Sequence, residues 1–263
     1  MTRAGSDGTA GLGTVMVTGG AKRLGAAIAR ACAAAGALVV VHYGTSAAEA
    51  EALAAEIGGV AVGGDLSRTD EIGALFDRAI AAAEGPITGL VNSASLFEED
   101  RPEAIDPQLA ARLYAINCTA PAMLGAALAA QPGLEQGAIV NLLDQKLANP
   151  NPDFFSYSLT KYALAGATEM MAMAFAPRVR VNAVAPGLTL PSGDQTEDEF
   201  DRVVRENLLR RPVGADQVVA AVVYLLGASS VTGQTIHVDS GQRFLKRTGD
   251  VMFETRRPER RDG

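Results

Sequence analysis

The sequence predicts an α/β protein in which one parallel β-sheet is covered by helices on both faces. Three observations predict this class. Short, nearly continuous apolar runs recur along the chain, Ala-rich helical segments separate them, and glycines stand at several boundaries. Strands that are apolar on both faces are typical of a parallel sheet buried between helices. Right-handed crossovers then give a doubly wound sheet whose ligands bind at the carboxyl ends of the strands.

The first strand and the first helix are recognised by their composition and ends. Thr14–Thr18 is a β-branched run that ends in glycines, and Lys22–Ala35 is Ala-rich and stops at Gly36, a typical helix end. Ser46 is predicted to be the N-cap of the second helix. Further strands are predicted at Leu38–Tyr43, Val60–Gly64, Gly89–Asn92, Ala138–Leu143, Val179–Ala185 and Thr235–Val238, and further helices at Ser46–Ile57, Thr69–Ala83, Pro107–Ala130, Ser156–Phe175, Gln195–Arg210 and Asp216–Leu226.

Composition and charge limit the classes of function. The 263 residues suit one large domain, and 48% hydrophobic with 20% charged residues is typical of a globular protein. A formal net charge of −7 disfavours nucleic-acid binding, which demands a basic surface. No stretch approaches the roughly 20 apolar residues needed to span a membrane, and the first thirteen residues lack the apolar segment of a signal peptide. We therefore expect a cytoplasmic protein that binds neither nucleic acid nor a membrane.

The chain is predicted to form a single catalytic domain at 14–245, preceded by a flexible glycine-rich lead at 1–13. The segment 246–263 is polar and rich in both signs of charge, which favours a solvated or partly docked tail over a second domain. Cys32 and Cys118 are predicted to be reduced packing thiols. His42 and His237 have no metal-ligand spacing, so no metal site is expected.

A glycine loop joins the first predicted strand to the first predicted helix. Gly19 and Gly20 permit a tight turn, and Gly25 permits close packing of the helix on the strand. The helix N-terminus offers unpaired N–H groups and a positive dipole to a pyrophosphate. Because the cluster stands between a first strand and a first helix, it predicts a dinucleotide site.

The end of the second predicted strand indicates which dinucleotide binds. Folds that prefer NAD carry an acidic residue about 20 residues after the loop, and none occurs between Gly25 and Ala48. Hydroxyls, an imidazole and cations suit the 2′-phosphate of NADP(H) instead. We therefore predict NADP(H), held at this end by Lys22, Arg23, His42, Tyr43 and Ser46.

Four residues have the types and positions of a catalytic group. Tyr157 and Lys161 form a Tyr-x-x-x-Lys pattern that places both on one helical face. The charge of Lys161 is expected to lower the phenol pKa, so that Tyr157 exchanges a proton near neutral pH. Asp144 ends the fifth strand, and Asn117 lies within a long helix, where a buried amide needs a reason. An alternative for Asp144 is a strand-end carboxylate that caps a nearby turn.

With Asn92 after the fourth strand and Pro186-Gly187 after the sixth, these motifs resemble the short-chain dehydrogenase/reductase family over residues 14–243. The resemblance implies a single-domain Rossmann fold with a seven-stranded parallel sheet and a homotetramer whose contacts include the helix of Met170, Met171 and Met173. It also implies a catalytic tetrad of Asn117, Asp144, Tyr157 and Lys161, with a water held by Asn117 and the nicotinamide ribose held by Lys161. The further cofactor contacts that it implies are Gly19, Leu24, Asp65, Leu66, Asn92, Ser93, Ala94, Ser95, Tyr157, Pro186, Gly187 and Thr189.

Two departures from that family's pattern point to one of its branches. Arg23 stands where the loop usually carries a third glycine, and Asp144 stands where a serine usually donates a hydrogen bond to a substrate carbonyl. An ionised aspartate cannot donate and would repel the developing charge of an alkoxide. These departures resemble the pteridine reductases, which reduce C=N bonds of pterins and folates, as do Ser95-Leu96-Phe97 and the pattern formed by His42, Tyr43 and Ser46.

The predicted function is NADPH-dependent reduction of a pterin, dihydropteridine or folate-like heterocycle. Asp144 would accept hydrogen bonds from the ring, and Tyr157 would supply the proton. Phe97 would stack on the heterocycle or pack beneath a substrate loop, and Arg23 would meet a substrate carbonyl or a cofactor phosphate. The predicted substrate contacts are thus Arg23, Ser95, Phe97, Asp144 and Tyr157. The alternatives are a carbonyl or 3-oxoacyl reductase of the same family and an NADP-binding sensor without catalysis.

Overall fold

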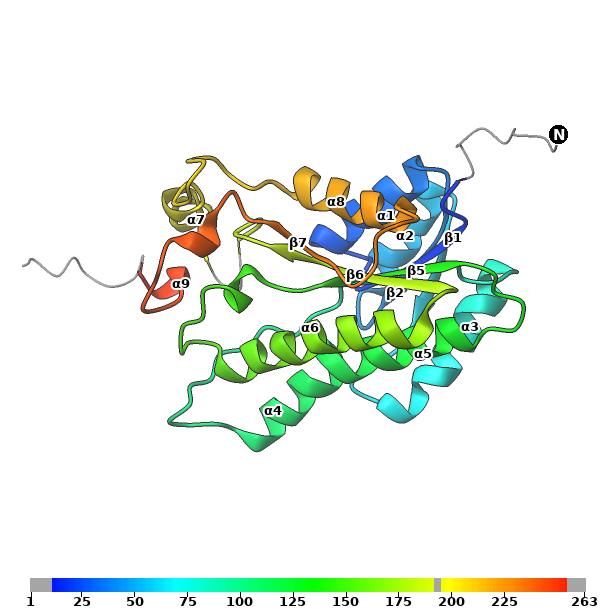
Figure 1. Cartoon of the computed structure of the whole chain (residues 1–263), viewed down its shortest axis with the longest axis horizontal. Coiled ribbons are helices and arrows are strands. Elements are labelled where there is room, and N and C mark those ends of the chain that lie inside the picture. The colour runs from blue at the N-terminus through cyan, green and yellow to red at the C-terminus, as the bar shows by residue number, and fades with distance from the viewer. Residues whose placement is uncertain (1–10, 192–194, 255–263) are drawn as a thin grey trace, which may run out of the picture.

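The computed structural model describes residues 11–191 and 195–254, which form three layers with a sheet in the middle (Figure 1). Within this part of the chain, seven strands pair in parallel in the order β3-β2-β1-β4-β5-β6-β7. The doubly wound sheet predicted from the sequence is confirmed. The strands are β1 (Thr14–Thr18), β2 (Leu38–Tyr43), β3 (Val60–Gly63), β4 (Gly89–Asn92), β5 (Gly137–Leu142), β6 (Val179–Pro186) and β7 (Thr235–Val238).

The order of the strands reverses between β1 and β4. These two strands are neighbours in the sheet, with Thr18 beside Asn92, although β2 and β3 separate them along the chain. A crevice for ligands opens at such a reversal, outside the carboxyl ends of the strands. The glycine loop follows β1 and the segment Ser93–Phe97 follows β4, so the topology brings both to this crevice.

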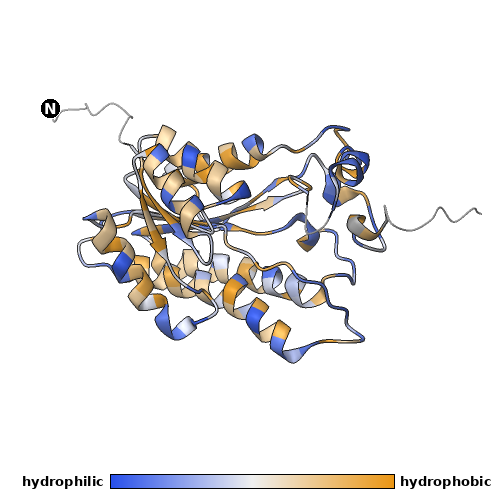
Figure 2. Cartoon of the chain, turned by 180° about the vertical axis from the view of Figure 1, so that it is seen from behind, coloured by the Kyte–Doolittle hydropathy of each residue, from blue (hydrophilic) through white to orange (hydrophobic). Residues whose placement is uncertain are grey.

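Helices cover both faces of the sheet, and alternate strand residues pack against them. Val15 and Val17 of β1 belong to the core on one face, whereas Met16 belongs to the core on the other. Figure 2 shows apolar residues along the sheet between the helical layers and polar residues over the loops. One layer contains α1 (Arg23–Ala34), α2 (Ala47–Ile57) and α8 (Ala215–Gly227), and the other contains α3 (Ile72–Ala83), α5 (Ala120–Ala130) and α6 (Phe155–Phe175).

The predicted helix Pro107–Ala130 is continuous but includes a π-helical turn. It consists of α4 (Pro107–Tyr114), η2 (Ala115–Thr119) and α5. Its length and composition would allow it to cross a membrane, so the prediction that no stretch approaches such a length is wrong here. Half of its most apolar window is buried within the protein, and Leu124 and Leu128 are fully inaccessible. The segment therefore serves as a core helix of this fold.

Two local predictions are corrected by the structure. The predicted helix Gln195–Arg210 is much shorter: α7 spans Glu197–Val203, and the Asn207 amide then donates to the carbonyls of Val204 and Arg211, which closes the following segment into turns. Ser46 precedes α2, but its side chain makes no capping hydrogen bond. Its backbone (φ −97°, ψ 58°) lies outside the extended region that aims an N-cap side chain at the first turn.

The remaining elements lie near the ends of the strands. They are η1 (Thr69–Glu71), η3 (Gln145–Leu147), η4 (Gln242–Phe244) and α9 (Val251–Glu254). Figure 1 shows α9 close to α7, at the end of the molecule opposite that where the described chain begins. Residues 1–10 of the predicted lead, 192–194 and the predicted tail residues 255–263 lie outside the described residues.

We expect Gly25 to tolerate no side chain, because α1 starts in direct contact with the glycine loop. A Cβ at Gly25 would lie 2.1 Å from the Gly19 oxygen and 3.1 Å from the Gly20 Cα, and backbone atoms cannot move aside as side chains do. Gly25→Ala should therefore destabilise the fold by about 1–3 kcal/mol or more. Gly73→Ala is the control: this exposed position of α3 has no atom within 4 Å of an added Cβ, and it should gain up to about 1 kcal/mol.

Denaturant unfolding of both variants measures the difference. Equal stabilities of Gly25→Ala and the wild type would contradict this account of the loop.

Candidate active site

Two cavities meet at Tyr157. One, of about 630 Å³, follows the carboxyl ends of β1, β2 and β4, and we call it the glycine-loop cavity. The other, of about 370 Å³, lies beyond Tyr157, between the segments that follow β5 and β6, and we call it the Asp144 cavity. The walls common to both are Arg23, Leu24, Ser95, Leu143, Tyr157 and Pro186.

Close backbone contacts shape the glycine loop. Gly19 has a φ of +61°, and a Cβ there would lie 2.9 Å from the Ala94 Cα. Arg23 also has a positive φ, +52°, so an arginine occupies a conformation that glycine adopts more readily. Its guanidinium donates to the Pro191 carbonyl. Arg23 thus lines both cavities and joins the loop after β1 to the segment after β6.

His42 supports this loop as a neutral imidazole. It is buried, its Nδ1 accepts a 3.2 Å hydrogen bond from the Gly19 N–H, and its Nε2 lies 3.1 Å from the Gly64 oxygen. Burial lowers the pKa of His42 to about 4, against the opposing effect of the bond to Gly64. The residue therefore ties the loop after β1 to the end of β3, and it does not supply a positive charge at neutral pH.

Most of the predicted cofactor contacts line the glycine-loop cavity. Asn92 lines neither cavity; its amide is buried and donates to Asn141 at 2.8 Å, across β4 and β5. Gly187 and Thr189 line the Asp144 cavity. The glycine-loop cavity is lined by Gly19, Lys22, Arg23, Leu24, His42, Tyr43, Ser46, Asp65, Leu66, Ser93, Ala94, Ser95, Tyr157, Lys161 and Pro186.

These residues fit a dinucleotide. Close backbone atoms leave no room for a side chain at Gly19 or Gly25, and the N-terminus of α1 between them borders the cavity, where it can face a pyrophosphate. Thr18 Oγ1 accepts hydrogen bonds from the N–H groups of Ser93 and Ala94 and so fixes the opposite wall. Two cations line the cavity: Lys22, which lies 2.8 Å from Glu49, and the buried Lys161.

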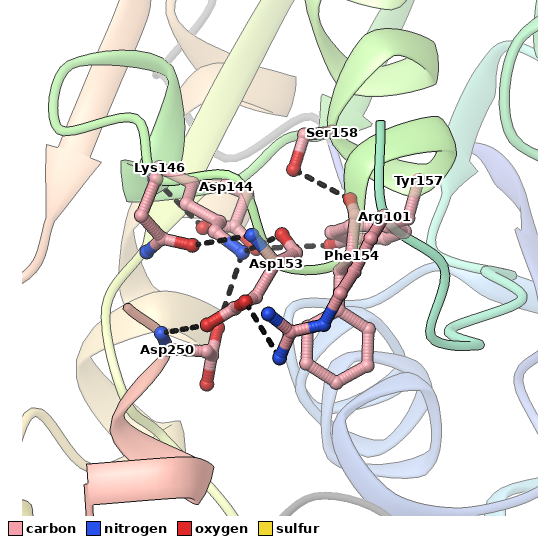
Figure 3. Close-up of polar contacts among 9 residues, drawn as sticks. Arg101, Asp144, Lys146, Asp153, Phe154, Tyr157, Ser158 and Asp250 are labelled. Carbon is pink, nitrogen blue, oxygen red and sulfur yellow. Dashed lines mark hydrogen bonds and ion pairs between the residues drawn. The ribbon is translucent and has the colours of Figure 1, made fainter. Parts of the chain in front are cut away.

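Tyr157 and Asp144 form a hydrogen-bonded pair in which the tyrosine is buried and the aspartate is half-buried (Figure 3). The Tyr157 hydroxyl donates to Asp144 Oδ2 at 2.9 Å, and Asp144 Oδ1 accepts from the Lys146 N–H at 2.8 Å. Asp144 therefore contacts the tyrosine and also caps η3. Its position is compatible both with a partner of Tyr157 and with a carboxylate that caps a turn. Burial raises the pKa of Asp144, and burial with the nearby Asp144 charge holds the pKa of Tyr157 well above its ordinary value.

Lys161 is directed at the backbone of β5. Its ammonium donates to the Leu142 carbonyl at 2.8 Å and lies 5.6 Å from the centre of the Tyr157 ring. Burial lowers the pKa of Lys161 to about 8, and the Asp144 charge opposes this. The expectation that Lys161 lowers the Tyr157 pKa is wrong for this arrangement, because the phenol is buried and faces the Asp144 carboxylate.

Asn117 lies in the π-helical turn and holds the segment after β4. Its Oδ1 accepts from the Leu96 N–H at 2.8 Å, and its Nδ2 donates to the Leu96 carbonyl at 2.9 Å and to Thr160 Oγ1 at 3.2 Å. The buried amide is thus explained by its backbone partners. Asn117 lines neither cavity, so it acts on the site through the position of Leu96 and its neighbours.

The first turn of α6, the helix that carries Tyr157, is stabilised by the carboxylate of Asp100 from another loop. Asp100 accepts hydrogen bonds from the Ser156 N–H and hydroxyl, and an acidic group is favourable at a helix N-terminus. Phe154, which precedes the helix, has a φ of +53°. Its ring stacks on Phe97, with centroids 4.0 Å apart, and Phe97 meets the Tyr157 ring edge-on at 4.7 Å. Phe97 lines the Asp144 cavity.

Sequence reasoning missed a polar cluster beside Asp144 (Figure 3). The buried Lys146 donates to the Asp153 carbonyl at 2.6 Å and lies 3.2 Å from Asp250 Oδ2. The Asp250 N–H donates to Asp153 Oδ2 at 2.7 Å, and Arg101 pairs with Oδ1 at 3.1 Å. The one available signal was the position of Lys146, two residues after Asp144; nothing local connects it with Asp250.

The structure offers no centre for metal or disulfide chemistry in residues 11–191 and 195–254. Cys32 and Cys118 are free, buried thiols. No group of three or more His, Cys, Asp or Glu side chains in that part could hold a metal ion.

Comparison with known proteins places this geometry in a family. A family profile described as "Enoyl-(Acyl carrier protein) reductase" matches residues 19–243. The chain is 34% identical over 243 residues to 3beta-hydroxysteroid dehydrogenase 1 of Eggerthella lenta, across 87% of this chain and 92% of the relative. The chain belongs to the short-chain dehydrogenase/reductase family.

Two further relatives lie in the branch that the sequence resembled. The crystal structure of FolM alternative dihydrofolate reductase 1 from Brucella canis, complexed with NADP, has a TM-score of 0.86 and 40% identity and covers 93% of this chain and 99% of its own. Dihydromonapterin reductase from Enterobacter sp. is 26% identical over 231 residues, across 87% of this chain and 95% of the relative. The resemblance to the pteridine reductase-like branch is confirmed.

The neutral state of His42 predicts a specific acid sensitivity. In the unfolded chain His42 takes up a proton below its ordinary pKa of 6.5, whereas in the folded protein it does so only near pH 4. Acid therefore favours unfolding as the pH falls through this window, by at most about 3 kcal/mol from this residue. His42→Asn keeps an acceptor for Gly19 without the titration, and it should lose less stability between pH 6.5 and 4 than the wild type.

Urea unfolding at several pH values measures how the free energy of unfolding of each protein changes with pH. Parallel pH profiles for the two proteins would show that the folded His42 titrates normally.

Proposed function

We propose that this protein is an NADPH-dependent reductase of a flat, pterin-like heterocycle, a dihydropterin or a folate-like compound. The observation that carries the proposal is the Asp144 carboxylate, held at 2.9 Å from the Tyr157 hydroxyl where the two cavities meet. A pterin presents amino and ring N–H donors, and a carboxylate accepts from both. The FolM relative and the dihydromonapterin reductase support this substrate class.

The glycine-loop cavity is the proposed NADP(H) site. Bound NADPH supplies the hydride. Around it, the start of α1 would hold the pyrophosphate, and Lys22, Tyr43 and Ser46 would meet the 2′-phosphate, while Lys161 would hold the nicotinamide ribose. The FolM relative was solved with NADP, which supports this choice of cofactor.

The proton would come from the tyrosine–aspartate pair. The raised pKa of Tyr157 keeps its hydroxyl protonated at neutral pH, so it can act as an acid. Asp144, whose pKa is also raised, would orient the hydroxyl, accept from the heterocycle and share the proton. Phe97 would present an aromatic face to the ring, and Arg23 would meet a carbonyl oxygen or a cofactor phosphate from its place between the cavities.

A carbonyl reductase is the second candidate. The 3beta-hydroxysteroid dehydrogenase relative and the description of the matching family profile favour it. In that case Asp144 would have to be protonated to donate to a substrate carbonyl, and its raised pKa is in the right direction for that state.

We further propose a cytoplasmic homotetramer with α6 at a subunit contact. Met170 and Met173 of α6 are 65% and 80% exposed, and Leu159 and Tyr162 on the same helix are also exposed. An unpaired apolar face of this kind is typical of an interface. Met171 is buried in the core of its own subunit and does not belong to this surface.

Cofactor preference tests the glycine-loop assignment. The wild type should show a higher kcat/KM with NADPH than with NADH. Ser46→Asp would place a carboxylate beside the 2′ position, repel the phosphate and accept from a 2′-hydroxyl, so the preference should shift toward NADH by about tenfold or more. Ser229→Asp, at an exposed serine that lines neither cavity, should leave the ratio unchanged. A wild type that prefers NADH would refute the assignment.

Substitution of Asp144 tests the substrate class. Asp144→Ser should lower kcat/KM for dihydrobiopterin or dihydrofolate by about ten- to a hundredfold, the loss of one charge-assisted hydrogen bond, and leave ketone reduction equal or improved. Asp144→Asn should also impair the heterocycle reaction, because it removes the charge. Tyr157→Phe is the reference for loss of the acid and should lower kcat/KM by about 10²–10⁴-fold. Unchanged pterin reduction in Asp144→Ser, or a wild type active on ketones alone, would replace this proposal by the carbonyl reductase.

A further inference from the structure

We propose that the segment Leu245–Glu254, which we call the C-terminal strap, is a specificity-determining wall of the Asp144 cavity, held in place by the ion pair of Lys146 and Asp250. The strap would restrict the cavity to compact, unconjugated dihydropterins and exclude substrates with a long side chain, such as the aryl-glutamate tail of a folate. This inference rests on the proposed function for its substrate class.

The strap is fixed to the segment after β5 at Leu245 and at Asp250, and to the segment after α7 at Arg247. The Asn149 amide donates to the Leu245 carbonyl at 2.7 Å, and the Asp250 N–H donates to Asp153 Oδ2 at 2.7 Å. Arg247 pairs with Glu206 at 2.5 Å. These contacts join residues about 40 to 100 positions apart in the chain, so the strap is docked by the tertiary structure rather than by local turns.

The ion pair is buried deeply enough to enforce one position of the strap. The side chain of Lys146 is 6% exposed and that of Asp250 is 16% exposed. Each charge loses its hydration there, and removal of one partner leaves the other uncompensated. Lys146 has a further acceptor in the Asp153 carbonyl and lies 5.2 Å from the centre of the Phe154 ring. Displacement of the strap would therefore remove the carboxylate partner of the Lys146 ammonium.

The strap also continues the aromatic stack that reaches Tyr157. Phe253 packs parallel to Phe154, with centroids 5.8 Å apart and an angle of 14°, and the Arg101 guanidinium lies 5.8 Å from the Phe253 ring. Phe154 in turn stacks on Phe97, the residue placed to contact a heterocycle. The strap thus supports both the wall of the cavity and the aromatic floor beneath it.

The strap limits the room beyond the tyrosine. Arg247, Asp250 and Val251 line the same cavity as Asp144 and Tyr157. Its volume of about 370 Å³ lies near the lower end of the roughly 300–1,000 Å³ of small-molecule sites. A bicyclic ring with a short side chain suits such a space, whereas an extended tail directed toward Asp250 and Val251 would have to displace the strap and break the Lys146–Asp250 pair.

The test compares two substrates that share the ring and differ in the tail. For the wild type, kcat/KM should be higher for dihydrobiopterin than for dihydrofolate. Asp250→Ala, which removes the ion pair, and Phe253→Ala, which removes the stack, should each raise the ratio of dihydrofolate to dihydrobiopterin by about tenfold, through a lower KM for dihydrofolate. Asp250→Asn keeps the shape of the side chain and one acceptor, so its ratio of dihydrofolate to dihydrobiopterin should lie between those of the wild type and Asp250→Ala. Lys246→Ala, at an exposed strap position outside both cavities, is the matched control.

Hydrogen exchange tests the docking without any substrate. Backbone amides of 245–254 should exchange faster in Asp250→Ala than in the wild type or in Lys246→Ala. An unchanged substrate ratio, a parallel loss for both substrates, or unchanged exchange would overturn the role of the strap.

Failure of the proposed function gives a different result. A wild type that reduces neither pterin but reduces carbonyls would refute the pterin proposal. In that case the same variants are compared by the ratio of kcat/KM for long to that for short 3-oxoacyl thioesters. A ratio that is equal in the wild type and the variants would overturn the role of the strap.

Discussion

The hydrogen bond between Tyr157 and Asp144 constrains the rest of the active site. Tyr157 lies in the first turn of α6 and Asp144 lies between β5 and η3, and their side chains meet at 2.9 Å only because α6 starts and β5 ends where they do. Asp100 supports the start of α6, and the Lys146 N–H holds the other carboxylate oxygen of Asp144. The structure therefore positions this one contact from both sides.

Burial shifts the pKa values of the candidate catalytic groups. The pKa of Tyr157 and that of Asp144 are raised, whereas that of Lys161 is lowered to about 8. In each case loss of hydration is the largest cause, and it disfavours the charged form of each group. These shifts favour the protonated forms of Tyr157 and Asp144 and weaken the hold of Lys161 on its proton.

Local patterns in the sequence account for the fold and for the choice of Tyr157 and Lys161 as candidate catalytic residues. Apolar runs gave the strands, and the Tyr157–Lys161 spacing needs only a helix to place both side chains on one face. The ionisation of His42 could not be derived in this way, because it depends on burial between Gly19 and Gly64 from two other segments. Nor could the pairing of Lys146 with Asp250, since the two residues are 104 positions apart and each sits in a polar stretch without periodicity.

Arg23 joins the two cavities, for which we have proposed different ligands. It starts α1, at the proposed cofactor site, while its guanidinium holds the Pro191 carbonyl on the segment after β6. A ligand in one cavity that draws the guanidinium toward itself also changes the free energy of ordering the other segment. Thermodynamic reciprocity then requires that occupation of the second cavity alter affinity in the first by the same factor. A ligand that displaced Arg23 from Pro191 in one cavity would therefore change the affinity of the other cavity, in either direction, without a separate regulatory site.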